Sequence, residues 1–173
     1  MGELMFPLFF HDESIETDSA GTQGLINHEI DPSSGKLMAA DGIDASRFRS
    51  KRITPQLAND SDLILCFTDH QKRQIANTSP RAARRTFTVT DFANVCEAMD
   101  NAGMVEGDTV AERAQSVISG ASMVRHALPD APDIADPFRK EFDMFQTAHD
   151  QMGEAFAKIA HVLEPAKGAH ASA

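Results

Sequence analysis

The sequence contains no tryptophan, no tyrosine and only two cysteines, Cys66 and Cys96. Two cysteines are too few for the disulfide framework of a small secreted domain, and Cys66 lies in an apolar run. We therefore expect buried free thiols in a reducing compartment. Eleven phenylalanines and eight methionines must supply most of the bulky core. A chain of 173 residues is long enough for one domain with such a core.

Basic residues are also scarce, since 16 lysines and arginines stand against 26 aspartates and glutamates, for a net charge of −10. Phosphate contacts need a basic surface, so nucleic acid is not an expected partner. The basic runs 47–52 and 81–85 are exceptions that we interpret as solvated surface. No apolar run approaches the ~18 residues of a membrane span, and the apolar N-terminus lacks the basic region of a signal peptide. We expect a cytoplasmic protein with no membrane partner.

Helix start signals recur along the chain, either as an N-cap residue followed by proline or as a capping box. They occur at Asp31-Pro32, Thr54-Pro55, Thr68 with Gln71, Thr109 with Glu112, and Asp136-Pro137. With the apolar spacing that follows them, these signals and Asp91 predict helices over 32–41, 55–59, 68–77, 91–99, 110–128 and from 136 to about 163. Residues 1–10 are predicted to form a further helix, broken at Pro7.

Three segments have the pattern of strands. Ile15–Asp18 and Thr86–Thr90 alternate β-branched residues with others, whereas Asp62–Phe67 is a continuous apolar run. Such a run is typical of a strand buried on both faces of a parallel sheet. Strands alternating with helices predict an α/β domain. We assign residues 1–165 to a single domain and 166–173, which are small and polar, to a disordered tail.

Several short motifs occur in an order typical of one family. They are an apolar first helix, Ser19-Ala20-Gly21-Thr22, Gly42-Ile43-Asp44, the two later strands and Asp136-Pro137-Phe138. From Gly2 to about Leu163 the chain resembles the bacterial low-molecular-weight protein tyrosine phosphatases. The resemblance implies a three-layer α/β sandwich with a parallel sheet of strand order 2-1-3-4. It implies hydrolysis of phosphotyrosine proteins through a cysteinyl-phosphate intermediate, without metal or other cofactor. Bacterial relatives often act on tyrosine kinases of exopolysaccharide export.

In that family a Cys-x5-Arg-Ser-Pro loop joins the first strand to the first helix. The cysteine thiolate attacks phosphorus, while backbone N–H groups and the arginine hold the phosphoryl oxygens. This sequence contains no Cys-x5-Arg, because Lys72 stands six residues after Cys66 and Ala102 six after Cys96. Met1-Gly2-Glu3-Leu4 resembles the helix that directly follows the loop. We therefore expect the 173 residues to lack the interior first strand and the nucleophile, Met1 to be an internal methionine, and this chain to be inactive.

The resemblance assigns two site residues. Asp136 matches the general acid that protonates the departing tyrosine oxygen, although its position before proline also fits a helix N-cap. Asp130 and Asp133 lie nearby, and we interpret them as solvated loop carboxylates. Ser19 matches a serine that supports the phosphate loop, although a serine in a turn fits equally well. Many relatives have a histidine near the position of Phe48, and this sequence has none there.

Two other functions remain open. The chain is alternatively a non-catalytic, phosphatase-like binding or structural remnant. Arsenate reductases share the fold but need two further cysteines, and residues 69–78, which follow Cys66, contain none. His28 and His70 have no metal-ligand spacing, so no metal site is expected.

Overall fold

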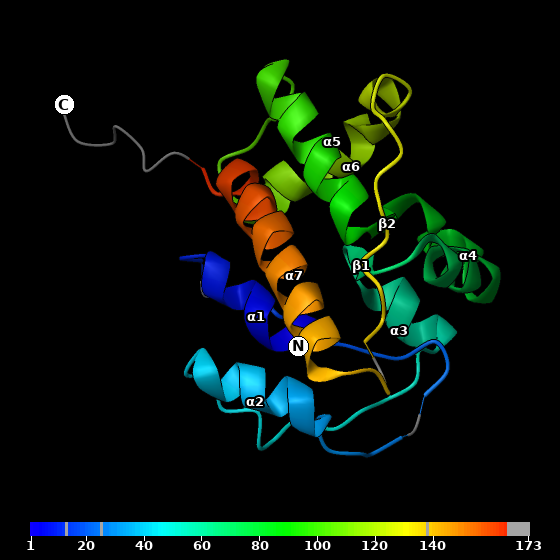
Figure 1. Cartoon of the computed structure of the whole chain (residues 1–173). Coiled ribbons are helices and arrows are strands. Elements are labelled where there is room, and N and C mark those ends of the chain that lie inside the picture. Colours follow the sequence, from blue (N-terminus) through cyan, green and yellow to red (C-terminus); the bar gives the residue numbers. More distant parts are fainter. Residues whose placement is uncertain (13, 25, 138, 166–173) are drawn as a thin grey trace.

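The computed structural model describes residues 1–12, 14–24, 26–137 and 139–165, so the expected tail 166–173 lies outside the described residues. Figure 1 shows the arrangement of the elements. In chain order they are α1 (Gly2–Met5), the 3₁₀ helix η1 (Phe6–Phe9), α2 (Pro32–Ala40), α3 (Pro55–Asp60), β1 (Ile64–Cys66), α4 (Asp69–Thr78), the 3₁₀ helix η2 (Pro80–Arg85), β2 (Thr86–Thr88), α5 (Val89–Asn101), α6 (Val110–Arg125) and α7 (Phe142–Leu163). The first helix changes type at Phe6, next to Pro7, which confirms the predicted break there.

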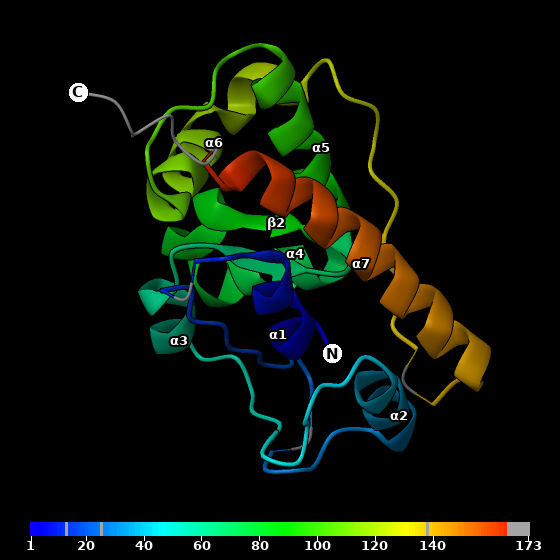
Figure 2. The same ribbon diagram turned by 90° about the vertical axis from the view of Figure 1, so that its left-hand side faces the viewer.

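The sheet described here consists of two parallel strands. Ile64 pairs with Thr86 and Cys66 pairs with Thr88. Helices α3 and α4 lie on one side of these strands, and α5 and α7 lie on the other (Figures 1 and 2). All three residues of β2 are buried, as a strand between two helical layers requires. The result is the three-layer α/β arrangement that the family resemblance implies.

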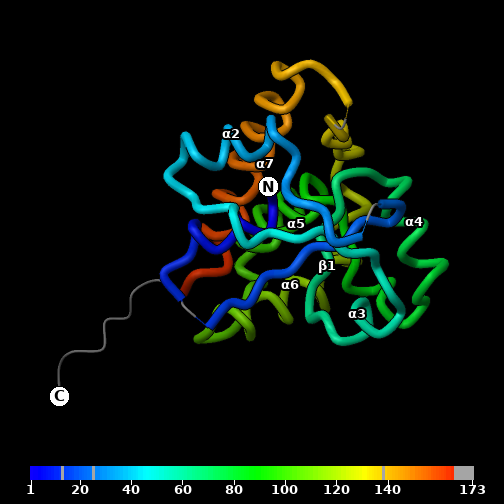
Figure 3. Tube along the Cα trace, turned by 90° about the horizontal axis from the view of Figure 1, so that it is seen from below, coloured from blue at the N-terminus to red at the C-terminus, as the bar shows by residue number. Residues whose placement is uncertain are grey.

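The strand expected at Ile15–Asp18 is not formed. A strand needs a ladder of hydrogen bonds with a neighbour, and no backbone hydrogen bond joins this segment to β1 or to any other residue that the structure describes. Further along, residues 21–24 and 26–28 lie beside residues 50–53 (Figure 3), and Gly21 forms an isolated bridge with Arg52. Of the order 2-1-3-4, the described residues therefore form only the pair of strands numbered 3 and 4.

Most predicted helix starts are confirmed. The side chains of Asp31, Thr54, Thr68 and Thr109 each accept a backbone hydrogen bond, and the last two form complete capping boxes. Helix α5 differs, because Thr88 is its N-cap and accepts from the Asp91 N–H at 3.2 Å. The helix therefore begins at Val89, and the strand predicted to reach residue 90 ends at Thr88.

The prediction that Asp136-Pro137 caps the last helix is wrong. Helix α7 begins at Phe142, with Glu141 as its N-cap. Between them the Lys140 N–H donates to the Pro137 carbonyl at 2.9 Å in a turn, and Arg139 has a left-handed φ of 61°. A left-handed residue interrupts a right-handed helix, so a helix opened at Pro137 cannot run on into α7. Phe138 lies outside the described residues.

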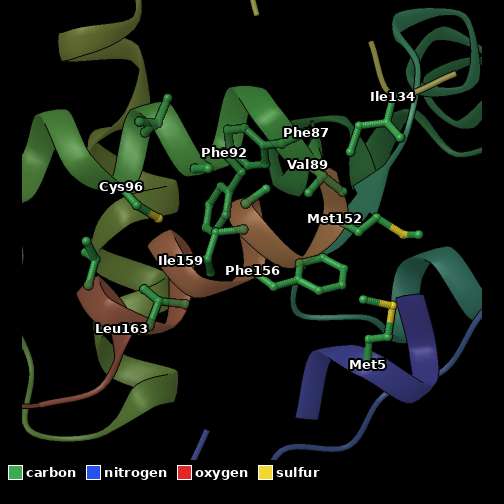
Figure 4. Close-up of a cluster of buried hydrophobic side chains, with 14 of the residues drawn as sticks. Met5, Phe87, Val89, Phe92, Cys96, Ile134, Met152, Phe156, Ile159 and Leu163 are labelled. Atoms are coloured by element: carbon green, nitrogen blue, oxygen red, sulfur yellow. The ribbon is translucent and has the colours of Figure 1, made fainter. Parts of the chain in front are cut away.

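The core lies between the sheet and α7. The rings of Phe87 and Phe92 have centroids 5.0 Å apart (Figure 4). The ring of Phe156 packs edge-on against that of Phe6, with centroids 5.1 Å apart. Each such aromatic pair contributes about 0.5–1.5 kcal/mol beyond the area it buries. Because Phe156 lies on α7 and Phe6 follows α1, this packing fixes the N-terminal segment against the last helix.

Candidate active site

The carboxyl end of β1 is the edge of the sheet at which the candidate site residues gather. The chain leaves the strand through Phe67 and Thr68 and enters α4 at Asp69. Gln71 holds this corner, since its side-chain oxygen accepts from the Phe67 N–H at 2.9 Å and its own N–H donates to the Thr68 hydroxyl at 3.1 Å. Ligand sites of open α/β sheets lie outside the carboxyl ends of their strands.

The loop before α7 is fixed to this corner by three consecutive residues. The Ile134 N–H donates to the Phe67 carbonyl at 2.9 Å, and Ile134 is 2% exposed. The Asp133 carboxylate accepts from the Asp69 N–H at 2.9 Å, at the start of α4. The Pro132 carbonyl accepts from the Thr90 hydroxyl at 2.6 Å, in the first turn of α5. Residues 132–134 are thus bound to β1, α4 and α5 at once.

Asp136 lies two residues beyond this anchored segment and is exposed. It does not cap α7, which begins six residues later. Its proximity to the carboxyl end of β1 follows from the Ile134–Phe67 hydrogen bond, because two extended residues span at most about 7 Å. A carboxylic acid on a short, anchored loop beside a sheet edge can deliver a proton to a ligand bound there.

Ser19 is half-buried and contacts the first helix. Its hydroxyl is 2.5 Å from the Glu3 carboxylate, to which it donates a hydrogen bond. The Thr17 hydroxyl donates to the Glu3 backbone carbonyl at 2.8 Å. Two side chains of the segment 17–19 therefore fasten it to the first turn of α1, so Ser19 makes a contact between segments, and residues 15–20 form no turn.

Neither cysteine has the properties of a nucleophile. Burial raises the pKa of the Cys66 thiol to about 12 and raises the pKa of the Cys96 thiol as well. The Cys66 Sγ donates to the Phe87 carbonyl at 3.2 Å inside the sheet, and Cys96 lies in the core (Figure 4). A thiolate is the reactive species, so both thiols stay protonated and inert at neutral pH.

Two hollows are found elsewhere on the surface. One, of about 690 Å³, is open to solvent and lies between α2 and residues 42–46. The other, of about 300 Å³, is lined by residues of α1, η1 and α7 and by Asp41. Neither hollow is lined by Asp136 or Ser19. The residues described here contain no cluster suited to a metal ion and no helix long and apolar enough to cross a membrane.

The sequence does not reveal two of the contacts that hold residues 132–137, which we call the acid loop. It predicts a solvated carboxylate at Asp133, whereas this side chain accepts the Asp69 N–H. It predicts that Thr90 ends a strand, whereas the Thr90 hydroxyl donates to the Pro132 carbonyl. The partners are 64 and 42 residues apart in the chain, so no local pattern could have identified them.

The fold and this sheet edge define a three-layer α/β protein with its candidate site at the carboxyl end of β1. A family model described as low molecular weight phosphotyrosine protein phosphatase matches residues 1–108, well over half of the chain. The chain therefore belongs to the low molecular weight phosphotyrosine protein phosphatase family.

Individual relatives agree with this. A low molecular weight protein-tyrosine-phosphatase, Ptp, of Acinetobacter johnsonii is 35% identical over 69 residues, 40% of this chain and 49% of its own length. A probable low molecular weight protein-tyrosine-phosphatase, EpsP, of Ralstonia nicotianae is 26% identical over 130 residues, 75% of this chain and 64% of its own length. The chain thus spans about half to two thirds of the length of these curated relatives.

Solved structures share the fold. The tyrosine phosphatase Wzb of Escherichia coli K30, in complex with sulphate, superposes with a TM-score of 0.65 at 20% identity, over 92% of this chain and 85% of its own. The YwlE arginine phosphatase of Geobacillus stearothermophilus gives a TM-score of 0.66 at 19% identity, over 92% and 80%. Because the same fold carries tyrosine and arginine phosphatases, the fold does not by itself decide the substrate.

Proposed function

We propose that this chain carries the acid half of a phosphotyrosine phosphatase site, with Asp136 as the general acid and Ser19 as a supporting residue. The observation that carries the proposal is the triple anchoring of residues 132–134 at the carboxyl end of β1. When the bond between phosphorus and the tyrosine oxygen breaks, the Asp136 carboxyl gives its proton to that oxygen, so that phenol leaves instead of phenolate. Ser19 supports the loop that would hold the phosphoryl group.

The 173-residue chain does not perform the whole reaction by itself. The family's chemistry needs a thiolate to accept the phosphoryl group and an arginine to bind its oxygens, and the sequence has no Cys-x5-Arg. The two cysteines present are buried thiols with raised pKa values. The alternative is a non-catalytic protein that keeps the family's fold for binding.

The expected partner is a phosphotyrosine protein, and a bacterial tyrosine kinase is the substrate we favour. The names of EpsP, Ptp and Wzb as tyrosine phosphatases support a phosphotyrosine protein as partner, and the choice of a kinase rests on the family resemblance alone. Arsenate reduction is disfavoured, because it needs cysteines that relay electrons to one another, whereas Cys66 is enclosed in the sheet and Cys96 in the core.

The test compares the chain with a chimera in which the first strand and Cys-x5-Arg-Ser-Pro loop of a relative precede Met1. We expect no turnover of phosphotyrosine peptide or p-nitrophenyl phosphate by the 173-residue chain, and turnover by the chimera. The chimera with its grafted cysteine changed to serine is the control and must be inactive. Turnover by the chain alone, or a folded chimera that hydrolyses no phosphomonoester, would contradict the proposal.

A further inference from the structure

Positive charge is concentrated in two parts of this acidic chain, residues 47–52 and residues 70–90. Residues 70–90 contain five lysines and arginines and no aspartate or glutamate. The remaining residues hold 11 basic and 26 acidic side chains, a net charge of −15. The five cations are Lys72, Arg73, Arg81, Arg84 and Arg85, and they lie on α4 and η2, which pack against each other.

The 3₁₀ geometry of η2 determines which of its arginines face outward together. With three residues per turn, side chains at i and i+3 eclipse each other. Ala82 is fully buried. Arg85 is three residues later and so lies on the same face of η2 as Ala82. Its Nη2 donates hydrogen bonds to the carbonyls of Ala58 and Asn59, at 3.2 and 2.8 Å. Arg81 and Arg84 form the next row and are both exposed. We call this pair the arginine ridge.

The arginine ridge differs from the other cations of this surface. Arg73 already pairs with Asp69 at 2.5 Å, and Arg85 holds the end of α3. Neither Arg81 nor Arg84 makes an ion pair with any residue that the structure describes. Ala83 between them is also exposed and small, so a ligand can approach the backbone. Two guanidinium groups are thus available side by side.

We propose that the arginine ridge binds an extended acidic segment of a partner protein, with acidic residues at alternate positions. Arg81 and Arg84 are separated by about 6 Å along η2, since a 3₁₀ helix rises about 2.0 Å per residue. Carboxylates two residues apart on an extended strand lie on one face and about 6.5–7 Å apart. The two spacings match, and each guanidinium fork can bind one carboxylate with two hydrogen bonds.

The charge distribution favours a short acidic peptide over nucleic acid. A polyanion long enough to leave the ridge meets a surface with a net charge of −15 and is repelled. A segment of a few residues interacts only with the basic region. The arginine ridge lies on η2, beyond the C-terminal end of α4, whereas residues 132–134 contact Asp69 at the N-terminal end of α4.

The experiment uses two fluorescein-labelled peptides of identical composition, Glu-Ser-Glu-Ser-Glu-Ser-Ser and Glu-Ser-Ser-Glu-Ser-Ser-Glu. Binding to the whole 173-residue chain is followed by fluorescence anisotropy at two salt concentrations. The test variant is Arg81→Glu with Arg84→Glu, and Arg85 is left unchanged because it holds α3. The matched control is Arg47→Glu with Lys140→Glu, the same change in charge at exposed positions elsewhere. Circular dichroism checks that both variants are folded.

We expect the alternating peptide to bind several-fold tighter than its isomer, and the ridge variant to bind it about tenfold more weakly, which corresponds to about 1.4 kcal/mol. The control variant should stay within about twofold, and binding should weaken as salt is raised. Equal binding of the two peptides, or equal losses in both variants, would overturn the proposal. So would tighter binding of a single-stranded oligonucleotide than of the peptide, because the ridge would then recognise phosphate.

Discussion

The carboxylate of Asp133 accepts a hydrogen bond from the backbone N–H of Asp69, 64 residues earlier in the chain, at 2.9 Å. This contact satisfies a donor at the exposed start of α4 and fastens the acid loop at the same time. The carboxylate also carries a negative charge at the positive end of the helix. Stability of α4 and placement of Asp136 are therefore linked through one side chain.

Replacement of Asp133 should loosen the acid loop. Asp133→Ala removes the acceptor, so we expect a loss of about 1 kcal/mol in the free energy of unfolding and faster hydrogen exchange over residues 132–137. Asp133→Asn keeps an acceptor oxygen and should behave nearly as the unaltered chain. Asp130→Ala is the control. If both alanine variants exchange alike, Asp133 does not anchor the loop.

Replacement of Asp136 should reveal its role in the chimera that carries the grafted catalytic loop. Asp136→Asn should slow hydrolysis of phosphotyrosine by about 10²–10⁴-fold, the usual contribution of general acid catalysis. A substrate with a very good leaving group should suffer less, because its oxygen leaves without a proton. Asp130→Asn should leave both rates unchanged. Equal losses on the two substrates would exclude Asp136 as the acid.

Two carboxylates make the stability of the α2–α7 contact depend on pH. His149 on α7 contacts Asp41 at 2.7 Å and Asp150 at 3.0 Å. Burial lowers the pKa of His149, but hydrogen bonds with Asp150 and Asp41 outweigh it, so the folded-state pKa is raised. The resulting stability is fully present below the unfolded-state pKa of about 6.5 and is lost as pH rises through the higher folded-state value.

Urea unfolding from about pH 5.5 to 8.5 measures this contribution. The stability difference between the unaltered chain and His149→Gln should be largest at the acidic end and shrink toward the alkaline end. The control is His28→Gln, the same substitution at an exposed loop position. A difference that grows with rising pH would mean that the folded-state pKa of His149 is lowered.

The buried thiols predict a simple chemical result. Because burial raises the pKa of both Cys66 and Cys96, neither should react readily with a thiol reagent such as DTNB in the folded protein at pH 8. In guanidinium chloride both should react fully. Rapid labelling of one thiol in the folded state would show that it is accessible, and would reopen the question of a reactive cysteine in this chain.

Much of the local structure could be predicted from the sequence, because its cause lies within one helical turn. The capping boxes at Thr68 and Thr109 each join residues three apart, and both form as predicted. The apolar spacing from Phe145 to Leu163 likewise predicts the buried face of α7, whichever residue opens the helix. The order and type of the later elements follow from such signals, whereas the family was indicated by a resemblance in the order of short motifs.

Contacts between distant segments decided the rest. Asp136-Pro137 has the local pattern of a helix start, yet α7 begins at Phe142, after a left-handed residue and a loop held at residues 132–134 by β1, α4 and α5. Ile15–Asp18 has the pattern of a strand but no neighbour to pair with among the described residues. A cap needs only its own turn of chain, whereas a strand or an anchored loop needs a partner that only the folded chain brings near.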